Sequence, residues 1–242
     1  MDSNKKSPDS LAPTANTNTN TTLNRPNSKG VIKLPGLHAR LTSPKVTVEL
    51  DPATKANRIA LMLDASGSMS GDKNRSLQDA CASFVTACNF GDTALAVETF
   101  GAEPEIRLAL TCQQPLLAMT VMTIPAHGGT PMSQAMDYVL NTYSITRGVI
   151  VSDGEPDSPT AAYSVAEGYK AAEIPVDCVH IGNSASGEAC LRRIAEMTGG
   201  LYIKFTDIAS FAKNFKMLTP AFYAQLTSGT VGAAMLGAKE VK

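Results

Sequence analysis

Short, continuous apolar runs alternate with amphipathic helical stretches through most of this chain. RIALMLD, TALAVETF, GVIVSD, IPVDCVHIG and LYIKF have the length of strands, and several are apolar on both faces. Between them, apolar residues recur at helical spacing, as in the stripe Leu77, Ala80, Cys81, Phe84, Val85 and Cys88. Right-handed crossovers turn such an alternation into a mostly parallel sheet with helices on both faces. The sequence therefore predicts a doubly wound α/β fold.

Local signals refine this fold. TALAVETF and EIRLAL are separated by residues 101–104, which predicts one antiparallel strand at the edge of the sheet. Another helical stripe begins at Met132, with Pro131 at the first helical position and Thr130 where a capping hydroxyl would lie. Further helices are expected over residues 158–172 and 187–198 and along a last stripe, which comprises Ile208, Phe211, Ala212, Phe215 and Leu218.

Composition and charge exclude several classes of protein. With 43% hydrophobic and 18% charged residues, the chain as a whole can bury a core. Its formal charge of -1 gives no overall field that favours nucleic acid or an anionic membrane. It has no apolar run of about 18 residues, and MDSNKKSPDS lacks the layout of a secretory signal. We therefore expect a cytoplasmic protein.

Sulfur-containing residues are expected in the core. The five cysteines show no C-x-x-C spacing, so they predict neither a disulfide framework nor a thiolate zinc site. Six methionines on apolar stretches are expected to fill gaps in the packing: Met62, Met69, Met119, Met122, Met132 and Met136.

The two ends of the chain differ from its middle. Residues 1–43 contain no aromatic side chain, are rich in Asn, Thr, Ser and Pro, and carry six Lys or Arg against two Asp. We predict a disordered polar tail over 1–43, an α/β domain over 44–226 that opens with the candidate strand VTVEL, and a flexible C-terminal tail over 227–242. The first tail either docks on an acidic partner or is a solvated leader.

Oxygen donors gather in three loops at predicted strand ends and helix starts. Asp64, Ser66 and Ser68 follow RIALML, Thr130 precedes a helix, and Asp153 follows GVIV. Ligands of doubly wound sheets bind at the carboxyl ends of the strands, so we expect these loops to converge. Two carboxylates and three hydroxyls suit Mg²⁺ or Mn²⁺ rather than Zn²⁺. The alternating donors after the strand predict an extended loop.

These positions resemble the metal-ion-dependent adhesion site of von Willebrand factor A, or integrin I-like, domains. The family pattern is D-x-S-x-S, then a distant Thr, then a distant Asp, and it is met by Asp64, Ser66, Ser68, Thr130 and Asp153. The resemblance covers about residues 57–218. It implies that Ser66 and Ser68 coordinate the cation directly, Thr130 directly or through water, and both aspartates mostly through waters.

The resemblance also implies a function. A cation with few anionic ligands remains open to a Glu or Asp of another protein, so the chain would be a metal-dependent protein-binding module, a cytoplasmic adaptor without enzymatic activity. His127, Gly129 and Glu155 are candidates for the rim that contacts the partner. The alternative is an accessory subunit of an AAA+ ATPase or chelatase-like complex; neither nucleic acid nor membrane is an expected partner.

Simpler readings of the same residues remain open. Asp64 can cap its loop, Thr130 can cap its helix, and Asp153 can stabilise a turn with Gly154, all without a metal. A haloacid-dehalogenase-like phosphatase is a weaker alternative, because it needs D-x-D and position 66 is Ser. The sequence contains neither a P-loop nor a G-x-G-x-x-G or G-x-S-x-G motif at this loop. Gly67 is expected to permit a tight path of the chain there.

Overall fold

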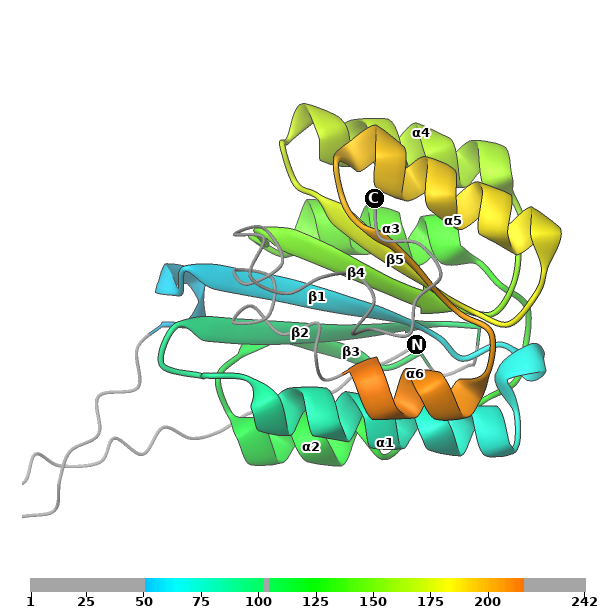
Figure 1. The fold of residues 1–242 in the computed structure, drawn as a ribbon. Helices are drawn as coiled ribbons and strands as arrows, with labels where there is room; N and C mark the ends of the chain where they lie inside the picture. The colour runs from blue at the N-terminus through cyan, green and yellow to red at the C-terminus, as the bar shows by residue number, and fades with distance from the viewer. Residues whose placement is uncertain (1–50, 102–104, 216–242) are drawn as a thin grey trace, which may run out of the picture. The chain divides into compact units, whose positions relative to one another are not determined.

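The computed structural model describes residues 51–101 and 105–215, which all lie in the unit Val48–Lys242. One sheet has the strand order β3-β2-β1-β4-β5-β6 (Figure 1). Its strands are β1 (Asn57–Asp64), β2 (Thr93–Phe100), β3 (Arg107–Thr111), β4 (Arg147–Ser152), β5 (Val176–Ile181) and β6 (Tyr202–Phe205). All neighbours pair in parallel except β2 and β3, which are antiparallel. The predicted doubly wound sheet with one antiparallel edge strand is confirmed.

The described helices cover both faces of the sheet (Figure 1). On one face lie α1 (Asp72–Ala87), α2 (Gln114–Val121) and α6 (Ile208–Asn214); on the other lie α3 (Met132–Thr142), α4 (Pro159–Ala171) and α5 (Ala185–Thr198). Leu61 and Leu63 of β1 belong to the first core, and Ala60 and Met62 belong to the second. Strands buried on both faces need apolar residues at successive positions, which explains the continuous runs in the sequence.

Most helix ends follow the expected signals. The Ser158 side chain accepts from a backbone N–H in the first turn of α4, and Gly199, at φ 72°, ends α5. Helix α5 begins two residues before the predicted start, because the Ser184 hydroxyl accepts from the amide of Gly187 and caps the helix. The predicted tails over 1–43 and 227–242, the VTVEL strand and Leu218 lie outside the described residues.

Helix α2 is the described α-helix that the sequence did not predict. Leu117 and Val121, one turn apart, are buried, whereas Met119 is 69% exposed and Met122, just after the helix, is 48% exposed. The prediction that these two methionines fill the core is therefore wrong, because they lie off the face that packs on the sheet. The other four predicted core methionines, Met62, Met69, Met132 and Met136, are buried as expected.

The cysteines behave as packing residues. Cys81, Cys88, Cys178 and Cys190 are buried and free, and Cys112 is half-buried. Burial raises the pKa of the Cys81 and Cys178 thiols, which disfavours the reactive thiolate. Among the helices that the structure describes, none is both long and apolar enough to cross a bilayer.

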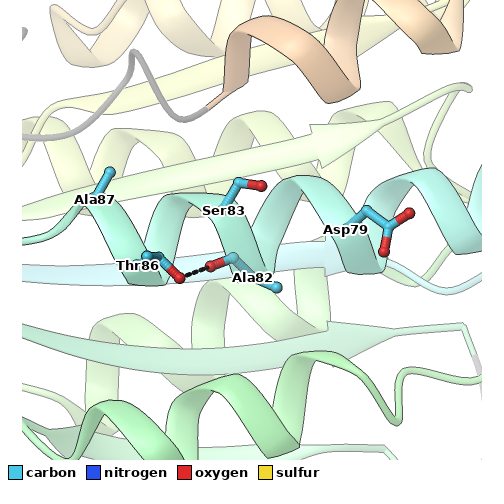
Figure 2. Close-up of a pocket in the computed structure, with 5 residues that line it drawn as sticks. All are labelled: Asp79, Ala82, Ser83, Thr86 and Ala87. Atoms are coloured by element: carbon cyan, nitrogen blue, oxygen red, sulfur yellow. Dashed lines mark hydrogen bonds between the residues drawn. The ribbon is translucent and has the colours of Figure 1, made fainter.

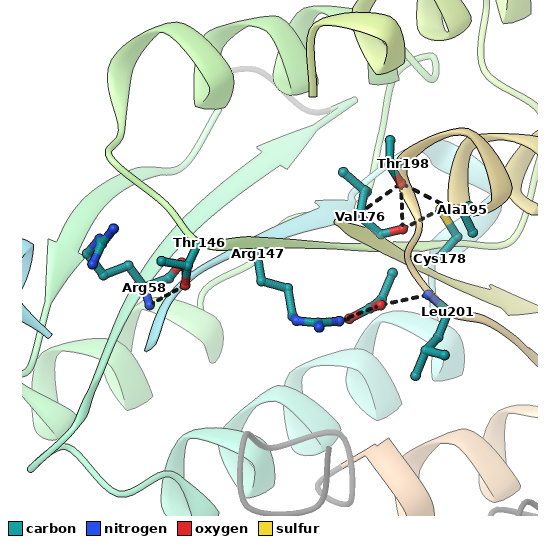
Figure 3. Close-up of polar contacts among 9 residues, drawn as sticks. Arg58, Thr146, Arg147, Val176, Cys178, Ala195, Thr198 and Leu201 are labelled. Carbon is teal, nitrogen blue, oxygen red and sulfur yellow. Dashed lines mark hydrogen bonds and ion pairs between the residues drawn. The ribbon is translucent and has the colours of Figure 1, made fainter. Parts of the chain in front are cut away.

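Hydrogen bonds and an ion pair connect residues at the amino-terminal ends of β4 and β5 (Figure 3). Arg147 Nη1 donates to Asp177 Oδ1 and Oδ2 at 2.8 and 2.7 Å, and the Leu201 amide donates to Asp177 Oδ1 at 2.8 Å. Beside it, Thr198 Oγ1 accepts from the Val176 amide at 3.1 Å. Asp177 is fully buried. The Arg147 guanidinium matches its charge, and its two oxygens accept three hydrogen bonds.

A pocket of about 590 Å³ lies on α1 (Figure 2). The described residues that line it all belong to this helix, from its middle to its end: Asp79, Ala82, Ser83, Thr86 and Ala87. The Thr86 hydroxyl donates to the Ala82 carbonyl at 2.8 Å, so it is already satisfied within the helix. The pocket adds no residue to the set of oxygen donors that the sequence singles out.

Candidate metal centre

Three loops meet at the carboxyl edge of the sheet, where the strand order reverses between β1 and β4. β1 ends on Asp64 and the adjacent β4 ends on Ser152, so the loops that follow them start side by side. The third loop leads into α3. Its His127 amide donates to the Ala65 carbonyl at 2.8 Å, and its Gly128 carbonyl accepts from the Gly67 amide at 3.1 Å. The predicted convergence of the loops is confirmed.

One chain of hydrogen bonds joins four of the five predicted ligand residues. Asp64 Oδ1 accepts from the Ser66 amide at 2.8 Å. The Ser66 and Ser68 hydroxyl oxygens are 3.0 Å apart, and Ser68 Oγ donates to Asp153 Oδ1 at 2.8 Å. The two hydroxyls and the Asp153 carboxylate are thus linked in series, and the Asp64 carboxylate joins them through the Ser66 amide.

Thr130 is held through its backbone. Its amide donates to Asp157 Oδ1 at 3.0 Å, and its carbonyl accepts from the Asp157 amide at 3.0 Å. The prediction that Thr130 caps α3 is wrong: Pro131 is the N-cap residue, helix α3 starts at Met132, and no side chain caps it. Asp157 holds the backbone of Thr130. The Thr130 hydroxyl does not cap the helix.

The loop after β1 is not extended as predicted. Ser66 has extended backbone angles, but Gly67–Met69 then form one turn of 3₁₀ helix. Gly67 itself does not have a positive φ, and a Cβ there would make an ordinary contact with the Gly128 carbonyl oxygen at 3.6 Å. The expectation that this position needs glycine to follow a tight path is therefore wrong.

The position that needs glycine is Gly101, directly after β2. Its φ is 119°, and a Cβ there would lie 2.7 Å from the Ser66 amide nitrogen and 2.9 Å from the Gly129 carbonyl oxygen. Gly101 thus lets the loops after β1 and before α3 approach each other. In the sequence it looked like an ordinary turn residue, because its role depends on segments that are distant along the chain.

Asp64 is a buried acid surrounded by uncharged donors. It is fully buried, its Oδ2 accepts from Ser152 Oγ at 2.5 Å, and no basic side chain among the described residues pairs with it. Burial raises its pKa, hydrogen bonds from Ser152 and Ser66 oppose that rise, and the Asp153 carboxylate adds to it. A divalent cation beside Asp64 would favour its charged form, and the carboxylate and hydroxyl oxygens of the set are of the kind that Mg²⁺ and Mn²⁺ prefer.

Asp153 has a basic partner. Lys73, in the first turn of α1, donates to Asp153 Oδ2, while Asp153 Oδ1 faces Ser68. The Asp153 side chain is 4% exposed and that of Lys73 is 43% exposed. The sequence did not single out Lys73, because a lysine at the start of a helix resembles part of an ordinary solvated face.

The model of the von Willebrand factor type A domain family matches residues 57–203, which is more than half of the chain. The chain belongs to the von Willebrand factor type A family. Domains of this family commonly act as protein–protein interaction modules.

Solved structures with this fold come from several biological settings. The conserved hypothetical protein BatB from Bacteroides thetaiotaomicron is 14% identical, with a TM-score of 0.57 over 71% of this chain and 99% of that one. The vWF domain of the type V pili tip protein Mfa5 from Porphyromonas gingivalis is 12% identical, with a TM-score of 0.58 over 73% and 96%. The SpRpn10 VWA domain is 13% identical, with a TM-score of 0.52 over 64% and 94%. A search of curated proteins gave no match.

The candidate rim of this von Willebrand factor type A domain is open to solvent. His127, Gly129 and Glu155 are all exposed, and they lie on the loops that flank the hydrogen-bonded chain. Within the described ranges, no group of three or more His, Cys, Asp or Glu side chains is arranged to hold a metal. A cation at this edge would therefore depend on serine and threonine hydroxyls as well as on the two carboxylates.

Proposed function

We propose that this domain binds Mg²⁺ or Mn²⁺ through Asp64, Ser66, Ser68, Thr130 and Asp153 and uses the ion to capture a Glu or Asp of a partner protein. One observation carries the proposal. Asp64 is fully buried without a basic partner among the described residues, and it is joined through Ser66 and Ser68 to a second carboxylate. Buried carboxylates that lack a matching charge are costly, and a cation would offset that cost.

This set of donors would leave the ion able to bind an external carboxylate, because it would neutralise little of the ion's charge. The hydroxyls of Ser66 and Ser68 are neutral ligands, so they would offset little of the ion's charge. Ser68 is exposed, which leaves the site open toward solvent, whereas Ser66 is buried. When bound, the ion would supply strong attraction for an external carboxylate, and the exposed His127 and Glu155 would contact the surroundings of that acid.

The proposed role is that of a cytoplasmic adaptor without catalytic activity. Ser66 lies where a haloacid-dehalogenase-like phosphatase would need a second carboxylate, and its hydroxyl is 3.0 Å from that of Ser68. The alternative role, an accessory subunit of an AAA+ ATPase or chelatase-like complex, would use the same binding site with the ATPase as the partner. Pull-downs in Mg²⁺ and in EDTA would identify the partner and separate the two roles.

Titration of Mg²⁺ and Mn²⁺ into the full chain by calorimetry tests the site directly. Ser68→Ala removes a hydroxyl bonded to Asp153 and should weaken binding at least about tenfold. Ser70→Ala is a matched control, because Ser70 is also exposed and lies in the same loop; it should bind as the wild type does. A wild-type chain that takes up neither ion, or equal binding by the two variants, would refute the proposal.

A further inference from the structure

The contact between Lys73 and Asp153 suggests a built-in counter-ion. We propose that Lys73 neutralises Asp153 while the domain is free of metal and leaves it when a divalent cation binds. Lys73 would thereby set the metal concentration at which the site fills. This inference rests on the proposed cation site and adds a regulator to it.

The Asp153 carboxylate lies between two competing partners. Its Oδ2 accepts from Lys73 Nζ, and its Oδ1 accepts from the Ser68 hydroxyl at 2.8 Å. A cation held by the serine hydroxyls would lie beside Oδ1 of Asp153. It would then be close to the Lys73 amine, which lies beside Oδ2 of the same carboxylate. Like charges on either side of one carboxylate repel, and that carboxylate is 4% exposed, so occupation by both cations is disfavoured.

Without Lys73, the metal-free domain would contain two buried acids and no matching charge. Asp64 is fully buried, the Asp153 side chain is 4% exposed, and the Asp153 carboxylate adds to the rise in the pKa of Asp64. Among the described residues, Lys73 is the basic side chain that contacts Asp153. It therefore stabilises the site before metal arrives.

The place of Lys73 in its helix supports this role. Lys73 is the second residue of α1, where the exposed backbone N–H groups disfavour a positive charge. No side chain caps this end of the helix, because the N-cap residue is Gly71. The lysine is thus placed against the local electrostatic preference, and Asp153 provides the compensating partner.

The pairing is also of a kind that can open. Among the described residues Lys73 pairs with Asp153 alone, through a flexible stem, and its side chain is 43% exposed, so it can move into solvent without a shift of α1. Arg147 at the other end of the sheet instead holds Asp177 through both carboxylate oxygens, at 2.8 and 2.7 Å. A single exposed ammonium is the more readily replaced of the two.

The test compares three variants of the full chain by Mn²⁺ titration. Lys73→Met keeps most of the stem and removes the charge, and it should bind Mn²⁺ about tenfold more tightly than wild type. Arg75→Gln removes one positive charge from the same turn, where Arg75 is 77% exposed and pairs with Asp72; it should change affinity by less than about twofold. Lys73→Arg keeps the charge and should bind no more tightly than wild type.

A second readout needs no metal. In EDTA at pH 7, Lys73→Met should melt at a lower temperature than Arg75→Gln, and added Mn²⁺ should raise its melting temperature by more. Equal Mn²⁺ affinity of Lys73→Met and Arg75→Gln, or weaker binding by Lys73→Met, would overturn the role of Lys73 while leaving the proposed site intact. If no variant binds Mn²⁺, the proposed site fails, and the metal-dependent role of Lys73 fails with it.

Discussion

Buried carboxylates at the two ends of the sheet have different hydrogen-bond donors. At the amino end, Asp177 accepts two hydrogen bonds from Arg147 and one from the Leu201 amide. At the carboxyl end, the equally buried Asp64 accepts from uncharged donors, the Ser152 hydroxyl and the Ser66 amide. An acid whose charge is matched within the protein serves as a structural anchor, whereas an acid held by neutral donors is suited to a cation from outside. We therefore expect stability to depend on the first end and ion binding on the second.

The largest expected effect is at the amino end. Asp177→Ala leaves Arg147 and the Leu201 amide without their shared partner and should lower the free energy of unfolding by about 4 kcal/mol. Urea denaturation measures this loss, and Mn²⁺ titration at a temperature where the variant is folded should give unchanged affinity. Ser68→Ala is the reciprocal control, with a stability loss under about 1 kcal/mol. A similar stability loss in the two variants would break the contrast between the ends.

Gly101→Ala should affect both properties. The new Cβ would overlap the Ser66 amide, and the residue would be held at a φ of 119°, so we expect a loss of about 3 kcal/mol in unfolding free energy. Because the overlap separates the loops, Mn²⁺ binding should weaken as well. Gly182→Ala is the matched control: its φ is 107°, and a Cβ there would meet nothing within 4 Å. Gly182→Ala should lower the free energy of unfolding through backbone strain but leave Mn²⁺ affinity unchanged. Loss of Mn²⁺ affinity in both variants would count against the specific role of Gly101.

A further buried carboxylate, Glu98 in β2, sharpens the comparison. Arg107 Nε lies 3.1 Å from Glu98 Oε1, yet neither carboxylate oxygen has a well-aligned hydrogen-bond donor in the described part of the chain. Burial raises the pKa of Glu98 from 4.5 to about 7, although the charge of Arg107 opposes the rise. An ion pair without aligned donors therefore does not anchor its acid as Arg147 anchors Asp177.

The raised pKa predicts a pH dependence with a definite sign. Between about pH 4.5 and 7 the folded chain holds the Glu98 proton more tightly than the unfolded chain, so this residue's contribution to stability falls as the pH rises. Glu98→Gln should remove roughly 2 kcal/mol of that fall between pH 5 and 7.5, as measured by urea denaturation. Glu105→Gln, which changes another partner of Arg107, should retain it. An unchanged slope in Glu98→Gln would contradict the prediction.

The sequence predicted the features that depend on local patterns. Strands buried on both faces produce continuous apolar runs, and the signals at Ser158 and Gly199 mark helix ends, so the sheet and most helices were predictable. The site loops were predictable because donors at strand ends must lie at one edge of a parallel sheet. Helix α2 was missed because it is short, and two of its apolar side chains, Leu116 and Met119, are exposed.

The remaining site residues depend on contacts between distant parts of the chain. Lys73 and Asp153 are 80 positions apart, and Ser152 and Asp64 are 88 apart. Nothing near Gly101 in the sequence indicates that its missing side chain makes room for Ser66. Such pairings are decided when the sheet assembles, and a single sequence shows only that each residue is compatible with them.

The reversal of strand order between β1 and β4 has a consequence for how such a domain can diversify. The chain leaves β1 toward one edge of the sheet and leaves β4 toward the other, so their following segments need not cross. Insertions outside the residues that bond across the two segments, such as Ser68 and Asp153, can therefore accumulate in one segment without disturbing the opposite half. New recognition surfaces can arise around an unchanged set of oxygen atoms, which separates the evolution of partner choice from the maintenance of the scaffold.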